Sequence, residues 1–180
     1  MTDQPSSAPR QSRQQKRRRL SPATGAILCA FFVHDVHAAD QWAISANDGH
    51  TTTNTAGKMV TAGTIVPDSL SLIRFEHGLP VLGKNLLLPT SVEGPPTTVW
   101  IAPDSCWAIV TAGSHAGGHA GDPVIEDDVV SVVGINHASP HLVQTLHAGS
   151  GAGQVTVARD QKWVLIGNRK SGTVSVFAVT

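Results

Sequence analysis

The chain has 180 residues, of which 41% are hydrophobic and 14% are charged, and its thirteen basic residues balance its thirteen acidic ones. That length allows one domain, and the low, balanced charge argues against a disordered chain and against a general nucleic-acid binder. Seventeen glycines and eleven prolines predict a turn-rich chain rather than a helical bundle.

The first 38 residues carry the pattern of a secretory signal peptide. The basic cluster Lys16–Arg19 precedes a short apolar run at 26–33, and residues 36–38 place small or medium side chains at a cleavage site. The run is too short to span a bilayer, which needs about 20 residues, so no transmembrane span is expected. We therefore expect residues 1–38 to be a signal peptide with a basic tail and 39–180 to be a periplasmic or secreted domain. The alternative is a disordered or amphipathic tail ahead of a cytosolic domain, and mass spectrometry of the mature N-terminus decides between them.

The remainder of the chain is mildly acidic. Residues 39–180 hold seven basic and eleven acidic residues, a net charge of −4. No run of Lys or Arg follows Arg19. No nucleic-acid partner is therefore expected.

Short runs rich in Val, Ile, Thr and Trp, bounded by Gly, Pro, Asp and Asn, predict strands along the rest of the chain. We expect ten strands, at residues 42–46, 69–75, 80–87, 98–102, 107–112, 129–135, 142–147, 154–158, 163–168 and 173–179. No stretch outside the signal segment keeps a helical period. The expected fold class is therefore all-β.

An internal repeat gives the strongest signal in the sequence. Residues 99–110 align with residues 155–166 without a gap, so that Asp104 matches Asp160 and Trp107 matches Trp163, each 56 residues apart. In both copies the aspartate lies in a short polar segment between two apolar runs, which suits a tight turn. We expect Trp42, in an incomplete earlier copy, to hold the same position as the other two tryptophans, and all three to belong to the core.

A second repeated module contains a Ser flanked by apolar residues. It occurs at 68–73, 128–133 and 172–177. A four-strand unit that returns every 40–60 residues is typical of a β-propeller blade. A β-sandwich would explain the strand content equally well, but not the repeated order of the modules.

The strand count predicts a partial β-propeller of about two and a half to three four-stranded antiparallel blades. One blade is complete at 98–147, the blade before it lacks its innermost strand, and the blade after it lacks its fourth. A ring needs typically four to eight blades, so the interpretations are a truncated gene product, an assembly of several chains, or a partner that completes the ring. Open blade edges favour self-association or a protein partner.

Two long insertions, at 47–67 and 112–127, interrupt the regular spacing of the predicted strands, and loops of that length are often functional. The second insertion holds His115, His119 and Asp122, a histidine–carboxylate set that can bind a divalent metal. The alternative is a flexible polar loop, because the i, i+4 spacing aligns two imidazoles only on a helix, and two glycines lie between these histidines.

A second candidate site, at the mouth of the central channel, consists of Asp48, His50, Glu93 and the loop at 112–127, which fall where propeller loops approach that channel. We expect this group to bind a small ligand. Signatures of a nucleophile are absent, since the sequence has no Gly-x-Ser-x-Gly motif. Cys106 is interpreted as a small hydrophobic residue.

Residues 103–112, Pro-Asp-Ser-Cys-Trp-Ala-Ile-Val-Thr-Ala, resemble the motif of the YVTN-type repeat proteins, roughly Pro-Asp-Gly-x-x-x-Tyr-Val-Thr-Asn. The Val-Ser-Val module resembles the strand that follows the motif, and weaker copies end at Asn47 and Asn168. No copy keeps the whole Tyr-Val-Thr-Asn tetrad. The resemblance covers about residues 41–180 and implies a fragment of a seven-bladed propeller that is related to the lactonase-like group.

Propellers of this kind include both binding proteins and enzymes. The expected function is an exported, non-catalytic binding or interaction module, because propeller active sites usually gather loops from more blades than this chain encodes. The alternative is a lactonase-like hydrolase of the 6-phosphogluconolactonase type, in which carboxylates and histidine activate water or hold a divalent metal beside a lactone ring. A redox accessory protein is a third, weaker possibility, and the sequence has no Cys-x-x-Cys-His haem site.

Overall fold

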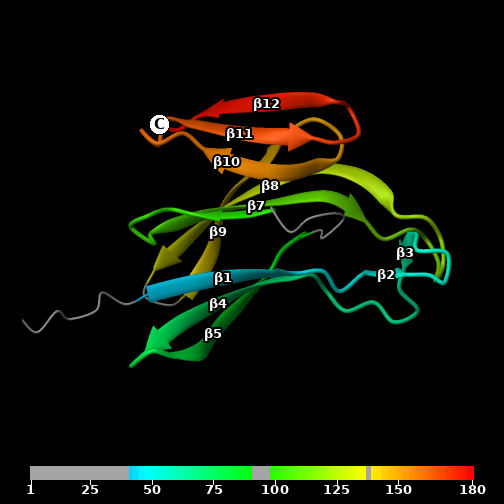
Figure 1. Cartoon of the computed structure of the whole chain (residues 1–180), viewed down its shortest axis with the longest axis horizontal. Coiled ribbons are helices and arrows are strands. Elements are labelled where there is room, and N and C mark those ends of the chain that lie inside the picture. The colour runs from blue at the N-terminus through cyan, green and yellow to red at the C-terminus, as the bar shows by residue number, and fades with distance from the viewer. Residues whose placement is uncertain (1–40, 91–97, 137–138) are drawn as a thin grey trace, which may run out of the picture. The chain divides into compact units, whose positions relative to one another are not determined.

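The computed structural model describes residues 41–90, 98–136 and 139–180, which belong to one compact unit spanning Ala38–Thr180. These residues form twelve strands and no helix, and therefore contain no helix that could cross a membrane (Figure 1). The strands are β1 (Gln41–Asn47), β2 (Thr51–Thr53), β3 (Met59–Thr61), β4 (Ser69–Glu76), β5 (Leu79–Leu87), β6 (Val99–Ile101), β7 (Trp107–His115), β8 (Ile125–Asn136), β9 (Ser139–His147), β10 (Ala152–Val157), β11 (Trp163–Asn168) and β12 (Thr173–Ala178). The predicted signal peptide at 1–38 lies outside the described residues and stays a prediction.

The larger sheets are three consecutive antiparallel meanders. Blade 1 consists of β1, β4 and β5, blade 2 of β6, β7, β8 and β9, and blade 3 of β10, β11 and β12, while β2 and β3 form a separate hairpin. Consecutive sheets of three or four strands, stacked in chain order, are the architecture of a propeller. The expected all-β partial β-propeller, with one complete and two incomplete blades, is therefore confirmed.

The three tryptophans occupy equivalent positions, as the repeat predicts. In each blade, the residue three positions after the tryptophan pairs with the serine of the second module. The three pairs are Ser45–Ser71, Val110–Ser131 and Ile166–Ser175. The sequence repeat is therefore a repeat of strand register.

The two predicted turns also have the same structure. Asp104 and Asp160 each accept a hydrogen bond through Oδ1 from the backbone N–H two residues later, at 3.0 and 3.1 Å. The residue between, Ser105 or Gln161, has φ of 57° in both copies. Aspartate suits this place because its side chain satisfies a donor that the tight turn leaves free.

Strand β7 contributes to two cores because its side chains alternate between the two faces of blade 2. Ala108 and Val110 lie in the core between blades 1 and 2, and Ile109 lies in the core between blades 2 and 3. The first core also buries Leu70, Leu72, Leu88, Val133 and Ile135. The second also buries Val130, Ala152, Val164 and Ile166.

The tryptophans differ in burial although their positions match. Trp107 packs against the second core and lies 4.9 Å from Trp100 between ring centroids. Trp163 is 49% exposed, since none of the described sheets covers its face of blade 3. The expectation that every tryptophan belongs to a core is therefore wrong for Trp163. Cys106 is exposed as well, so its interpretation as a packed hydrophobic residue is also wrong.

Candidate functional site

The first insertion begins and ends at the same end of blade 1, where it joins β1 to β4. Asp48 directly follows β1, and Asp68 directly precedes β4. Because Asn47 pairs with Ser69 in the antiparallel ladder, the two aspartates lie side by side at the base of the insertion. The chain between them carries His50 and the β2–β3 hairpin, which therefore starts from a fixed point of the fold.

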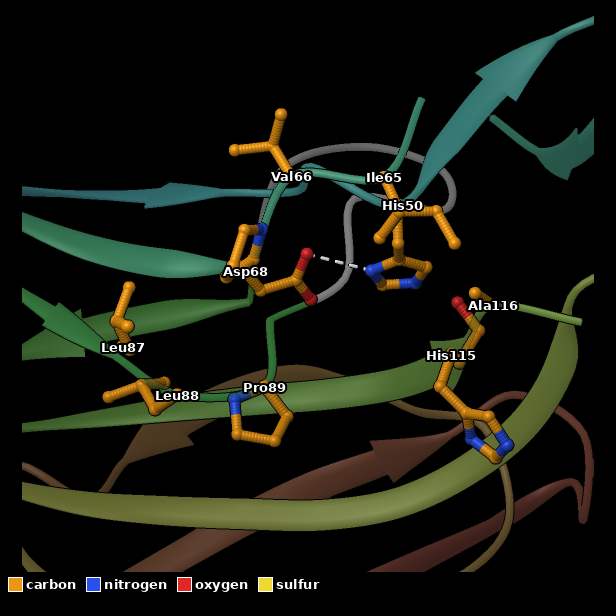
Figure 2. Close-up of a pocket in the computed structure, with 11 residues that line it drawn as sticks. His50, Ile65, Val66, Asp68, Leu87, Leu88, Pro89, His115 and Ala116 are labelled. Carbon is orange, nitrogen blue, oxygen red and sulfur yellow. Dashed lines mark hydrogen bonds and ion pairs between the residues drawn. The ribbon is translucent and has the colours of Figure 1, made fainter. Parts of the chain in front are cut away.

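Asp68 accepts hydrogen bonds from three donors, two in the first insertion and one after β5. Its Oδ1 accepts hydrogen bonds from the Gly49 backbone N–H at 2.8 Å and from Nδ1 of His50 at 2.7 Å. Its Oδ2 accepts one from the backbone N–H of Thr90, at 3.0 Å. Figure 2 shows the His50 ring turned toward this carboxylate. Asp68 therefore fixes the imidazole and joins the insertion to the segment after β5.

Asp48 has a more local role. Its Oδ1 accepts hydrogen bonds from the backbone N–H groups of His50 and Thr51, at 2.9 and 3.1 Å, and its Oδ2 accepts one from the Thr51 hydroxyl, at 2.6 Å. The same Oδ1 lies 3.1 Å from Nδ1 of His50. These bonds shape the turn that places His50 against Asp68.

The second ring nitrogen of His50 has no hydrogen-bond partner. A carboxylate only accepts, so Nδ1 carries the proton that is donated to Asp68, and in the neutral ring Nε2 is an acceptor. His50 is 7% exposed, and its Nε2 is buried. The hydroxyl of Ser114 is likewise buried without a partner. Most buried polar groups are hydrogen-bonded, so these two call for an explanation, as do Oε2 of Glu126 and Oδ1 of Asn168, which are also buried without a partner.

His50 and Ser114 line one open hollow of about 430 Å³, at the edge of blade 1 and the end of β7 (Figure 2). Its other lining residues are mostly apolar: Ile65, Val66, Pro67, Asp68, Leu87, Leu88, Pro89, His115 and Ala116. A volume of this size, with apolar walls and few polar groups, is typical of sites for small molecules.

Asp48, His50 and Asp68 are also the one group of three ligand-type residues, among those the structure describes, whose donor atoms lie within 4.8 Å of one another. Their arrangement fits hydrogen bonding better than a metal. The 2.7 Å contact between Nδ1 and Asp68 holds a proton, and backbone N–H groups already bind the carboxylate oxygens that face the ring. An ion between the three residues would have to displace these bonds.

The structure brings together only some of the residues that the sequence predicts as sites. Asp48 and His50 lie together, whereas Glu93 lies outside the described residues. In the predicted metal set, His115 lines the hollow but pairs with Asp127 at 3.0 Å, and His119 pairs with Asp122 at 3.4 Å. The three do not form one cluster of ligands.

Asp68 and Ser114 were not among the predicted site residues. Asp68 had a signal in the sequence, since it opens the first copy of the serine module as Asp128 opens the second. In the structure both aspartates bind a histidine at 2.7 Å: Asp68 binds His50 and Asp128 binds His147. Ser114 was not singled out as a residue, although it lies in the 112–127 loop that was expected to contribute to the second candidate site.

We expect the exposed pair of His147 and Asp128 to respond to pH. The hydrogen bond from Nδ1 to the Asp128 carboxylate, together with its negative charge and that of Asp127, raises the pKa of His147 above its ordinary value of 6.5. A raised pKa in the folded chain means that the contribution to stability is complete below the ordinary pKa and is lost as pH rises through the raised value. An NMR titration of the His147 ring measures the shift.

In that titration, Asp128→Asn should return the pKa of His147 toward its ordinary value. Asp104→Asn is the control, because Asp104 lies in the turn at the opposite end of blade 2 and should leave the titration unchanged. A wild-type titration at or below the ordinary value would show that the pair does not form in solution.

Comparison with known proteins yields only a likeness of fold. No family model matches the chain, and no curated protein matches it in sequence. A candidate 6-phosphogluconolactonase from Bacteroides fragilis superposes with a TM-score of 0.48 and 12% identity, over 73% of this chain and 34% of that one. A similar candidate from Bacteroides uniformis gives 0.48 and 12%, over 72% of this chain and 35% of that one.

Hydrazine synthase from Kuenenia stuttgartiensis gives a TM-score of 0.46 and 15% identity, over 76% of this chain and 46% of that one. The chain thus spans between a third and a half of the length of these proteins. At such values the likeness carries no conclusion about activity. The assignment as a partial β-propeller rests on the repeated strand register of the chain itself.

Proposed function

We propose that the chain is a non-catalytic binding module, and that the hollow beside His50 takes a small organic molecule with an apolar body and a hydroxyl group. The observation that carries the proposal is the buried, unpartnered Nε2 of His50, held in place by Asp68. A ligand hydroxyl that reaches this nitrogen would donate to it, and the free hydroxyl of Ser114 is a second polar group on the same hollow.

The walls of the hollow support an apolar ligand body. Ile65, Val66 and Leu87 are each more than half exposed, and Leu88 is buried beside them. Covering exposed apolar surface gains roughly 25 cal/mol for each Å² removed from water. In this arrangement the apolar walls supply affinity, and the two polar atoms orient the ligand.

We also propose that the blades are diverged YVTN-type repeats. The Nδ2 groups of Asn47 and Asn168, the residues that match the last position of the Tyr-Val-Thr-Asn pattern, donate to Ser71 Oγ at 2.8 Å and Ser175 Oγ at 2.9 Å. The two bonds join equivalent positions of blades 1 and 3. The side chain of this asparagine thus ties two neighbouring strands together in each of these blades.

The second candidate function is hydrolysis of a lactone. A histidine that donates through Nδ1 to a carboxylate, with Nε2 free, has the arrangement of a general base. Nε2 would take a proton from a water that attacks the lactone carbonyl, the ring C–O bond would break, and the proton would pass to the leaving oxygen. We rank this second because the hollow is open, and a site exposed to water supports charge development poorly.

Two probes separate these functions. Cyclohexanol, which has an apolar ring and one hydroxyl, should produce saturable shifts in the NMR methyl signals of Val66 and Leu88. His50→Phe, which removes the acceptor, should weaken binding about tenfold, a loss near 1.4 kcal/mol. His119→Phe is the matched control, because the His119 side chain is 91% exposed and should leave the affinity unchanged.

The second probe is δ-valerolactone, added with and without Mg²⁺ or Zn²⁺. A binding module should give no hydrolysis above the rate without protein. Hydrolysis that is lost in His50→Phe and kept in His119→Phe would reverse the ranking in favour of the hydrolase. The absence of saturable shifts with cyclohexanol would overturn the binding proposal.

A further inference from the structure

Blade 3 has one apolar face that none of the described sheets covers. Val155, Val164, Ile166 and Phe177 lie on its other face, against blade 2. On the uncovered face Trp163 is 49% exposed, Val174 60% and Val176 57%. The remaining positions of this face are Gln154, Thr156, Leu165, Gly167 and Ala178, so the face carries no charged side chain.

The register shows what kind of surface fits this face. Val174 and Val176 flank Ser175 as Val130 and Val132 flank Ser131 in blade 2. Trp163 and Leu165 likewise correspond to Trp107 and Ile109. In blade 2, Trp107, Ile109 and Val130 all pack against blade 3. The uncovered face of blade 3 thus corresponds to the face of blade 2 that blade 3 covers.

Blade 1 offers the complementary surface. Ala43, Ile73 and Leu82 lie side by side across its three strands, on the face turned away from the first core. Ala43 and Ile73 correspond in register to Ala108 and Val133 of blade 2, which pack against blade 1. Leu82 is 68% exposed, and none of the described sheets covers this face. This face of blade 1 therefore corresponds to the face of blade 2 that blade 1 covers.

We propose that the uncovered face of blade 3 docks on the uncovered face of blade 1 in a second copy of the chain. The chain builds this kind of interface twice, between blades 1 and 2 and between blades 2 and 3. The contact between copies continues the same stacking with the same register positions. It is heterologous, because each copy contributes a different face, and it leaves two further faces free to bind more copies or to close a ring.

Sedimentation equilibrium of the full chain tests the proposal. The wild type should have a mass that is a multiple of 18.8 kDa, the mass of one copy. Val174→Asp places a charge on the blade 3 face and Leu82→Asp places one on the blade 1 face, and each alone should give single copies. Val143→Asp is the matched control, since Val143 is also 60% exposed but belongs to the middle blade, and it should assemble as the wild type does.

A mixture of the two variants gives the sharpest result. Val174→Asp keeps an intact blade 1 face and Leu82→Asp keeps an intact blade 3 face, so the mixture should form a complex of two copies and no larger one. Circular dichroism checks that each variant is folded, and Val176→Asp replaces Val174→Asp if that variant is not. A wild type of single copies at every concentration would overturn the proposal, and so would a Leu82→Asp variant that still assembles alone.

Discussion

Replacing Leu72 by alanine should lower the free energy of unfolding by about 2–5 kcal/mol, the range found for large-to-small changes in protein cores. Leu72 lies on β4 and is fully buried in the core between blades 1 and 2. The smaller side chain loses its transfer free energy and leaves a cavity that two sheets, each held by its own ladder, can close only in part. Chemical denaturation followed by circular dichroism measures the loss.

Leu79→Ala is the matched control for this substitution. Leu79 is a leucine of the same blade, at the start of β5, and it is exposed. Its replacement should change the free energy of unfolding by no more than about 0.5 kcal/mol, as is usual at the surface. Equal losses in the two variants would contradict the packing of blade 1 against blade 2.

Asp68→Asn should lower the free energy of unfolding by about 2–4 kcal/mol, because hydrogen bonds to a largely desolvated charged group are strong and donors left without a partner are costly. The carboxylate accepts from Gly49, His50 and Thr90 with both of its oxygens. An amide has one acceptor oxygen, and its NH₂ group would face a donor. We therefore expect both lower stability and weaker binding of cyclohexanol.

Asp122→Asn is the control for the second substitution. Asp122 is an exposed carboxylate that accepts a hydrogen bond from the backbone N–H of His119. Its replacement should cost less than about 1 kcal/mol, because water can satisfy the freed donor. If Asp68→Asn cost no more than this control, Asp68 would not be the residue that holds the insertion in place.

The sequence predicted most of the blades because their signal is local and repeated. Alternating apolar residues and fixed turn residues locate each strand, and the repeat confirms the register. The hairpin of β2 and β3 escaped prediction because Thr51–Thr53 and Met59–Thr61 are three residues long, too short to show alternation. The extension of β7 to His115 escaped for another reason: its register shifts between Ala112 and Ser114, which breaks the period of two.

The candidate site was predictable only where its residues are close in sequence. Asp48 and His50 lie two positions apart in one insertion, and the turn between them brings their side chains together. Asp68 meets them because β1 pairs with β4, and Ser114 lines the same hollow because β7 extends into the second insertion. Such contacts depend on strand pairing over long sequence separations, which composition and motifs do not reveal.

The two cores on either side of blade 2 have no residue in common. Stability in stacked repeats is close to a sum of neighbouring contacts, so one end can open while the other stays closed. His50 and Asp68 lie between β1 and β4 of blade 1, and Ser114 and His115 on the same hollow belong to β7. Local unfolding of blade 3 should therefore leave the hollow intact. Hydrogen exchange should then detect opening of β10, β11 and β12 while the backbone amides around His50 stay protected. Recognition at the blade 1 end can thus persist while the blade 3 half of the proposed contact between copies opens.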